Sequence, residues 1–366
     1  MHEPTRALKH AIIYHFKHRV RCTAPADVSL AICVLAKDEG KSIGHCLRQL
    51  AAQSLIRNRI EVVEIHVVAN GTTDDTVAVA QGCAGLFVGS RAKLQVHDIH
   101  PGGKSRAWNR TVHEFASPDV DTFIFLDADV TFTGESVLDD MLSRLSRDMH
   151  LAAYSSFPLK DVATKSKKTP LDRFSLFVSG RTRHLEVING QLYVARASAL
   201  RDLWLPDQIP GEDGFLNGML CTRGFTQPAD LSLVSARSEP THYFHSHRPL
   251  EFVSHERRMI VGTIINRWIF EHLWSLKLTS PAGPLIRDWN ERDPAWIDRL
   301  INQRAVKNKW LIPSAILFSR FKKHADRTWW RYASYMPVAT AAFLLTLPPA
   351  ILANKRLKEV GAAATW

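Results

Sequence analysis

The stretch that most constrains this chain is DTFIFLDADV, residues 121–130. Residues 122–126 form a short run of aromatic, aliphatic and β-branched side chains, which is typical of a strand buried on both faces. Two carboxylates, Asp127 and Asp129, follow at once. Ligands of open α/β sheets bind at the carboxyl ends of strands, where a hard divalent cation can join carboxylates to a substrate's phosphates. The pattern therefore predicts a metal–diphosphate site. A strand-ending turn, in which Asp is common, is the alternative.

Three further strands precede this one, at residues 29–36, 61–69 and 94–99. Helical spacing of apolar residues follows the first strand, and a second helix is expected near residues 76–80, after the capping residues of segment 72–75. A third helix is expected over residues 105–115. This β-α-β-α-β alternation predicts an α/β fold with a mostly parallel sheet and helices on both faces.

Polar groups suited to a nucleotide stand at the ends of these strands. Glu39 could accept from a ribose hydroxyl, and Asn70 offers both a donor and an acceptor to a base edge. Gly102 and Gly103 allow a ligand to approach the backbone, and Lys104 supplies a positive charge for phosphate. Each residue taken singly is also ordinary turn chemistry. Taken together at successive strand ends, they predict one cleft.

Composition limits the class of protein. The 366 residues are 45% hydrophobic, which suits one domain of about 240 residues plus an extension. The net charge of +11 favours anionic partners, which are nucleotide phosphates, acidic lipid or nucleic acid. The five cysteines are odd in number and scattered, so they indicate no disulfide or zinc framework and favour a reducing compartment.

Six blocks of this sequence resemble the inverting family-2 glycosyltransferases of the GT-A fold. They are VLAKDEG (34–40), VVANGTTDDT (67–76), GGKSRAWNR (102–110), FLDADV (125–130), NGQLYVARASAL (189–200) and PGEDGFL (210–216). Their order and spacing agree with the family over residues 29–244, and six ordered blocks are more specific than any one motif.

On the donor side, the resemblance implies that Glu39, Asn70 and Asp74 line the pocket of a uridine or guanosine. It places Lys104 near the diphosphate or the donor sugar, and residues 189–190 beside the acceptor. The position of Asn70 is often an acid in the family, so the residues leave the nucleotide open.

On the catalytic side, the resemblance implies that Asp127 and Asp129 are the D-x-D pair that binds Mg²⁺ or Mn²⁺, with Asp129 the more direct ligand. Asp213 would occupy the position of the catalytic base. Glu212 is the neighbouring alternative, since either acid could instead cap a helix. In a histidine-dense segment, His245 or His247 is a candidate third metal ligand, with His245 preferred, or an ordinary strand or loop residue.

The C-terminal third changes character. Residues 249–331 show helical periodicity and predict a helical extension. Residues 332–354 hold no charged side chain and could span a bilayer by length. Pro337, Pro348 and Pro349 oppose a straight span, as do basic residues on both sides. We therefore expect a hairpin, bent at Pro348 and Pro349, that lies on an anionic membrane. The alternative is an ordinary buried helix.

The expected division is a basic N-terminal helix or extension (1–28), a GT-A catalytic domain (29–248), the helical extension (249–331) and the apolar segment (332–366). The leading hypothesis is a metal-dependent glycosyltransferase that uses a nucleotide-diphospho-sugar and a glycan or lipid-linked acceptor. It would act in the cytoplasm at the inner face of the cell membrane. A sugar-phosphate nucleotidyltransferase is an alternative, but its Gly-rich phosphate loop is not visible near the first strand. A basic nucleic-acid-binding protein would explain the charge but not the two acids, and we expect no nucleic-acid partner.

Overall fold

The computed structural model describes residues 29–58, 62–165, 168–169, 187–244, 249–306, 308–318, 321 and 329–359. The basic helix expected within residues 1–28 and the candidate metal ligands His245 and His247 lie outside the described residues.

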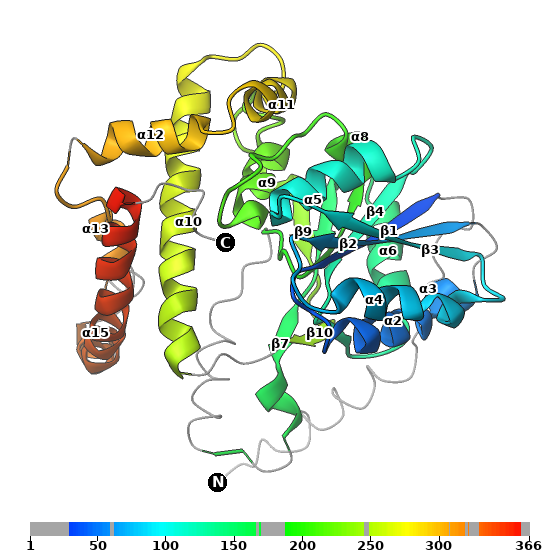
Figure 1. The fold of residues 1–366 in the computed structure, drawn as a ribbon. Coiled ribbons are helices and arrows are strands. Elements are labelled where there is room, and N and C mark those ends of the chain that lie inside the picture. The colour runs from blue at the N-terminus through cyan, green and yellow to red at the C-terminus, as the bar shows by residue number, and fades with distance from the viewer. Residues whose placement is uncertain are drawn as a thin grey trace, which may run out of the picture.

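A seven-stranded sheet forms the centre of the protein, in the order β3-β2-β1-β4-β8-β6-β9 (Figure 1). Its strands are β1 (Leu30–Ala36), β2 (Val63–Asn70), β3 (Ala92–Ile99), β4 (Thr122–Asp127), β6 (Ala153–Ser155), β8 (Leu192–Arg196) and β9 (Val234–Ala236). The first four strands of the chain run parallel, and β8 pairs antiparallel with both β4 and β6. The predicted mostly parallel sheet is confirmed. A small second sheet joins β5 (Thr131–Phe132), β10 (His242–Phe244) and β7 (Pro158–Lys160).

Both faces of the sheet are covered, as its continuous apolar strands require. In β1, Ala31, Cys33 and Leu35 point into one hydrophobic cluster, and Ile32 and Val34 point into another. The second cluster is closed by α2 (Ile43–Ala51), α3 (Ser54–Arg57), α4 (Thr76–Gly82) and α6 (Val137–Arg147). The first is closed by α5 (Lys104–Arg110), α8 (Ala197–Leu200) and α9 (Glu212–Cys221). The helix expected over residues 105–115 is α5 followed by the π turn Thr111–Phe115.

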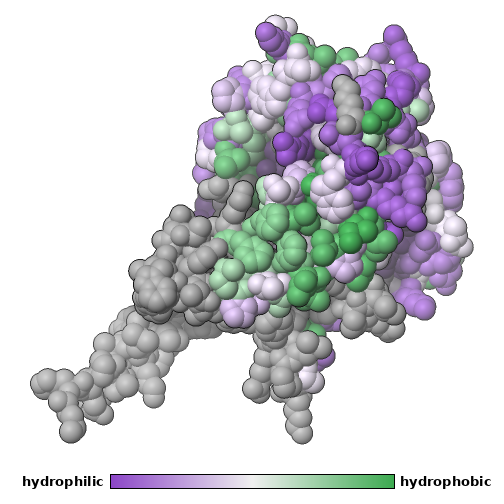
Figure 2. Space-filling view, turned by 90° about the vertical axis from the view of Figure 1, so that its left-hand side faces the viewer, coloured by the Kyte–Doolittle hydropathy of each residue, from purple (hydrophilic) through white to green (hydrophobic). Residues whose placement is uncertain are grey.

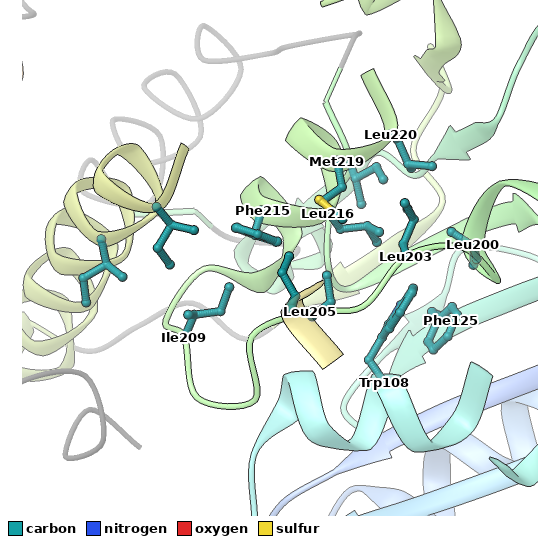
Figure 3. Close-up of a cluster of buried hydrophobic side chains, with 14 of the residues drawn as sticks. Trp108, Phe125, Leu200, Leu203, Leu205, Ile209, Phe215, Leu216, Met219 and Leu220 are labelled. Atoms are coloured by element: carbon teal, nitrogen blue, oxygen red, sulfur yellow. The ribbon is translucent and has the colours of Figure 1, made fainter. Parts of the chain in front are cut away.

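Helix α9, which carries the candidate base Asp213, rests on the larger cluster. Figure 3 shows its residues Phe215, Leu216 and Met219 in the same buried group as Trp108 and Phe125. Each of these side chains is at most 2% exposed. The start of α9 is therefore held against α5 and the central strand by close packing.

The C-terminal helices extend this core rather than forming a separate one. They are α10 (Pro249–Ser275), α11 (Gly283–Arg292), α12 (Trp296–Ala305), α13 (Ser314–Leu317) and α15 (Trp329–Glu359). Ile260, Ile264 and Trp268 of α10 are buried in the same cluster as α9. Helix α15 lies beside α10 at the outer edge of the protein (Figure 1). The predicted helical extension is confirmed.

The hairpin predicted at Pro348 and Pro349 is wrong, because α15 continues as one helix through both prolines to Glu359. Proline fixes φ near its helical value and removes one hydrogen bond, so a helix can continue where packing compensates. Here Ala339 before the prolines and Ala353 after them are both fully buried. Among the described helices, Tyr335–Glu359 alone is long and apolar enough to cross a membrane.

Candidate active site at the carboxyl ends of the strands

Asp74 fixes the loop that carries Glu39. The Asp74 carboxylate accepts hydrogen bonds from the backbone N–H of Gly40 and of Thr76, both at 3.0 Å. The backbone N–H of Glu39 donates to the Thr76 hydroxyl at 2.7 Å. The hydrogen bonds from Thr76 and Gly40 hold the pKa of Asp74 below its usual value. The first two strand-end loops are thereby joined just before α4.

Asn70 joins the second and third loops. Its side chain is only 4% exposed, its amide Nδ2 donates to the Ala36 carbonyl at 2.8 Å, and its Oδ1 accepts from the Gly103 N–H at 3.4 Å. Gly71, at φ +68°, lets these loops touch, because a Cβ there would lie 2.7 Å from the Gly102 Cα. The contact of Asn70 with a base stays a prediction, and each of these bonds uses one of the two hydrogen-bonding positions of its atom.

Lys104 connects Asp127, at the end of β4, to the start of α9. Its Nζ lies 2.7 Å from Asp127 Oδ1 and 3.1 Å from Glu212 Oε1, and donates to the Gly190 carbonyl at 3.3 Å. The Lys104 side chain is 21% exposed. Burial alone would lower the pKa of Lys104, but the two carboxylates outweigh it and raise the pKa. Burial raises the pKa of Asp127 to about 6, against the opposing pull of Lys104.

Asp129 differs from Asp127 in being exposed, and within the described part of the chain its carboxylate has no ion-pair or hydrogen-bond partner. Burial raises the pKa of Glu39, the hydrogen bond from Ser42 opposes this, and the nearby charge of Asp129 raises it further. Glu39 and Asp129 therefore lie near one another at this edge of the sheet.

No three histidine, cysteine or acidic side chains among the described residues converge into a closed metal cage. The oxygens of Asp127 and Asp129 still fit a hard cation such as Mg²⁺ or Mn²⁺, which takes one or two carboxylates and completes its shell with water and phosphate. Of the described histidines near this edge, His242 is buried in β10 beside Gln191, and burial lowers its pKa to about 3. The proposed third ligand, His245, stays a prediction.

Asp213 lies in the first turn of α9, next to the partner of Lys104. Burial raises the pKa of the Asp213 carboxyl, and the charge of Glu212 raises it further, although N–H groups of Gly214 and Gly190 oppose this. Together with Lys104, these acids border a hollow of about 10 Å³, roughly the space of one water molecule. The structure thus brings Asp213, Lys104 and Asp127 into one group.

Comparison with known proteins gives the class of enzyme. Residues 31–207 match the sequence profile described as glycosyl transferase family 2. The protein is a glycosyltransferase. This match favours the glycosyltransferase hypothesis over the nucleotidyltransferase and the nucleic-acid-binding protein. Among proteins with curated descriptions, none matches this sequence.

The fold of the glycosyltransferase is similar to that of a mannosyltransferase from Pyrobaculum calidifontis, solved with GDP-Man and Mn²⁺. The two share 16% identity over 96% of each chain, with a TM-score of 0.51. TarS from S. aureus in complex with UDP is 14% identical over 91% of this chain and 92% of its own, with a TM-score of 0.43. Glucosyl-3-phosphoglycerate synthase from Mycobacterium tuberculosis is 18% identical over 66% of this chain and 80% of its own, with a TM-score of 0.45. The mannosyltransferase supports the predicted GT-A fold, including the helical C-terminal region.

Sequence reasoning missed a second anchor of the glycosyltransferase site, which is Asp207. Its carboxylate accepts from Arg106 Nε at 2.9 Å, Asn109 Nδ2 at 3.1 Å and Asn290 Nδ2 at 3.3 Å. Arg106 also donates to the Pro101 carbonyl at 2.8 Å. Asp207 thereby fixes the loop before Lys104 and ties it to α11. No local pattern could reveal this, because Asn290 lies 83 residues away in the chain.

A larger cleft, of about 470 Å³, lies between the end of the π turn, the segment after α8, and α11 of the glycosyltransferase. Its lining includes Arg201, Trp204 and Arg287, and none of the predicted site residues. Arg201 donates to the Ser117 carbonyl before β4, so this cleft lies at the opposite end of β4 from Asp127.

Proposed function

We propose that this glycosyltransferase moves a sugar from a nucleotide-diphospho-sugar to a hydroxyl of a glycan or lipid-linked acceptor, with inversion, in the cytoplasm at the inner face of the cell membrane. The observation that carries the proposal is the position of Lys104. Its ammonium is paired with Asp127, of the D-x-D pair, and with Glu212, which adjoins Asp213. The ammonium of Lys104 therefore holds together the residues proposed to bind the metal and the turn that carries the proposed base.

The donor half of the site is formed by Asp129, Asp127 and Lys104. The free carboxylate of Asp129 would be the direct ligand of Mg²⁺ or Mn²⁺, while Asp127 is held in place by Lys104. When bound, the ion would supply positive charge to the donor's diphosphate. Lys104 would add a fixed charge at the same edge, where negative charge grows as the bond to the leaving group breaks. The complex of the mannosyltransferase with GDP-Man and Mn²⁺ supports this class of donor.

The acceptor half depends on Asp213. A hydroxyl acceptor must lose its proton as it attacks, so a base has to stand within hydrogen-bond reach. The carboxylate of Glu212 is engaged in an ion pair with Lys104, which leaves Asp213 as the acid available to the acceptor. Asp213 has a raised pKa, which makes it a stronger base than an ordinary aspartate. A single base and one in-line displacement give inversion at the anomeric carbon.

The proposal is tested by thermal unfolding with a panel of UDP-, GDP- and dTDP-sugars, each with and without Mn²⁺. A ligand at 100 times its Kd stabilises a protein by about 2.7 kcal/mol, which raises the Tm by several degrees. We expect one nucleotide class to raise the Tm only when Mn²⁺ is present. Asp129→Asn should abolish this effect.

Asp119→Asn is the matched control, because Asp119 is an exposed aspartate in the loop before β4. That variant should respond as the unmodified protein does. A protein that responds to no nucleotide sugar with Mn²⁺, or an Asp129→Asn variant that responds fully, would refute the proposed donor site.

A further inference from the structure

Helix α15 exposes a row of large apolar side chains, while its alanines at 339, 350 and 353 and one leucine, Leu357, are buried. Leu344 and Leu345 are 59% and 62% exposed, and Ile351 is 52% exposed. The opposite side of the helix, at Ala350 and Ala353, is fully buried. Helices at the surface of water-soluble proteins turn their apolar stripe toward the core and their polar face outward. Over residues 341–352, α15 instead turns large apolar side chains outward.

The exposed side chains lie on one side of the helix, because they recur every three or four residues. We call this set the outer stripe: Ala341, Leu344, Leu345, Pro348, Ile351 and Leu352. Two aromatic side chains outside α15 extend the apolar surface. Phe318, which is 44% exposed, stacks on Phe343 at 5.4 Å, and Trp310 is 43% exposed. Figure 2, which views the protein from this side, shows a broad apolar area.

Positive charge gathers at the C-terminal end of the outer stripe. Lys355 and Lys358 are exposed on the following turns of α15. Asn354 accepts the Leu311 N–H at 2.7 Å, which holds the exposed Lys309 beside the same end. Glu359, 3.8 Å from Lys355, is the single acid in α15. The surface therefore combines an apolar stripe with a basic border, and the whole protein carries a net charge of +11.

We propose that the outer stripe docks α15 into the interfacial layer of a bilayer that contains anionic lipid. Leu344, Leu345 and Ile351 would enter the boundary between headgroups and acyl chains. The lysines would face the headgroups, as basic residues do on membrane-bound amphipathic helices. Trp310, beside the basic end, suits the depth at which tryptophan side chains gather in membrane proteins.

The backbone of α15 favours the interface over a full span. Pro348 and Pro349 have no N–H, so the carbonyls of Leu344 and Leu345 lack their helical donors. Such carbonyls are costly in the hydrocarbon core but can bind water at the interface. In addition, α10 already covers one side of α15, so only the outer stripe can contact lipid.

The outer stripe is linked to the first turn of α9 through α10. On α10, the Asn266 Nδ2 donates to the Gly211 carbonyl at 2.7 Å, two residues before Asp213. One layer of helix therefore separates the outer stripe from the base. If the proposed function is right, this geometry favours an acceptor that is itself attached to a lipid.

The test is flotation of the full chain with vesicles, without donor or acceptor, so its result does not depend on activity. One vesicle set is phosphatidylcholine, and the other is an equal mixture of phosphatidylcholine and phosphatidylglycerol. We expect the protein to float with the mixed vesicles and to be released by high salt, because each lysine near an anionic surface adds about a fivefold gain in partition. The double variant Leu345→Glu/Ile351→Glu should bind at least about tenfold more weakly.

Val88→Glu is the matched control, because Val88 is an apolar side chain, 84% exposed, in the segment between the 3₁₀ turn Ala84–Phe87 and β3. It should bind the mixed vesicles as well as the unmodified protein does. The variants' Tm values and their response to nucleotide sugars, measured without vesicles, report separately on folding and on the proposed function.

Four results would overturn the proposal. They are no flotation of the unmodified protein, equal flotation of the double variant, resistance to extraction by alkaline carbonate, and a dimer in light scattering that the double variant abolishes. The third result would indicate a full span, and the fourth would assign the outer stripe to a second copy of this chain.

Discussion

Replacement of Asp213 by asparagine tests the catalytic assignment most directly. Asparagine has nearly the same shape and can still accept the Gly214 N–H that Asp213 accepts at 2.8 Å, so the start of α9 should be preserved. The amide cannot take a proton from the acceptor hydroxyl. General-base catalysis contributes about 10²–10⁴-fold, so we expect kcat to fall by that factor, or by about 3–5 kcal/mol in activation free energy.

The assay is initial-rate release of the nucleoside diphosphate at saturating donor, with donor binding measured separately by thermal shift. We expect Asp213→Asn to keep the donor-induced rise in Tm while kcat is lost. Glu212→Gln is the comparison, since it removes a carboxylate beside Lys104 without removing the proposed base. Near-normal turnover by Asp213→Asn, or a larger loss of kcat in Glu212→Gln, would show that the base has been assigned to the wrong acid.

The dependence of the rate on pH provides a second readout. A base acts only when deprotonated, so the rate should fall as pH decreases through the pKa of Asp213. Because burial and the charge of Glu212 raise this pKa, the acidic limb should lie above the ordinary aspartate value of about 3.9. Asp127, with a pKa raised to about 6, also titrates nearby. The acidic limb of the pH–rate profile can be assigned to Asp213 only if it is lost or displaced in the residual activity of Asp213→Asn. An unchanged limb in this variant would contradict the assignment.

Three further substitutions test how the site is held. Lys104→Met leaves two partly buried carboxylates unpaired, so we expect a loss of about 2–4 kcal/mol in the free energy of unfolding, measured by urea titration; an unchanged midpoint would contradict the ion-pair argument. Gly262→Ala places a Cβ 2.4 Å from the Pro210 carbonyl oxygen, so the free energy of unfolding should fall by roughly 1–3 kcal/mol and kcat should also fall. Gly82→Ala is the control, because nothing lies within 4 Å of its Cβ, and it should leave the free energy of unfolding unchanged or raise it. Asn290→Ala should lower the free energy of unfolding by about 1–3 kcal/mol and raise the KM for the donor, because it removes a hydrogen bond that holds the loop before Lys104. An unchanged KM would show that α11 does not support the donor site.

The sequence by itself determined the strands and the side chains at their ends. Residues 29–36 and 122–126 are apolar runs that end at turn residues, and a parallel sheet follows because such strands can bury both faces only between helices. The placement of Asp127 and Asp129 at the carboxyl edge is a direct consequence of strand direction.

Tertiary structure decided the partners of those side chains. The ion pairs of Lys104 with Asp127 and Glu212 join residues that are 23 and 108 positions apart, and Asp207 joins α5 to α11. Local periodicity cannot specify such contacts, because they depend on how whole helices pack on the sheet. The same reason explains α15. Its three prolines favour a bend locally, but burial of its alanines against α10 accompanies one continuous helix, whose outer stripe is turned away from the core.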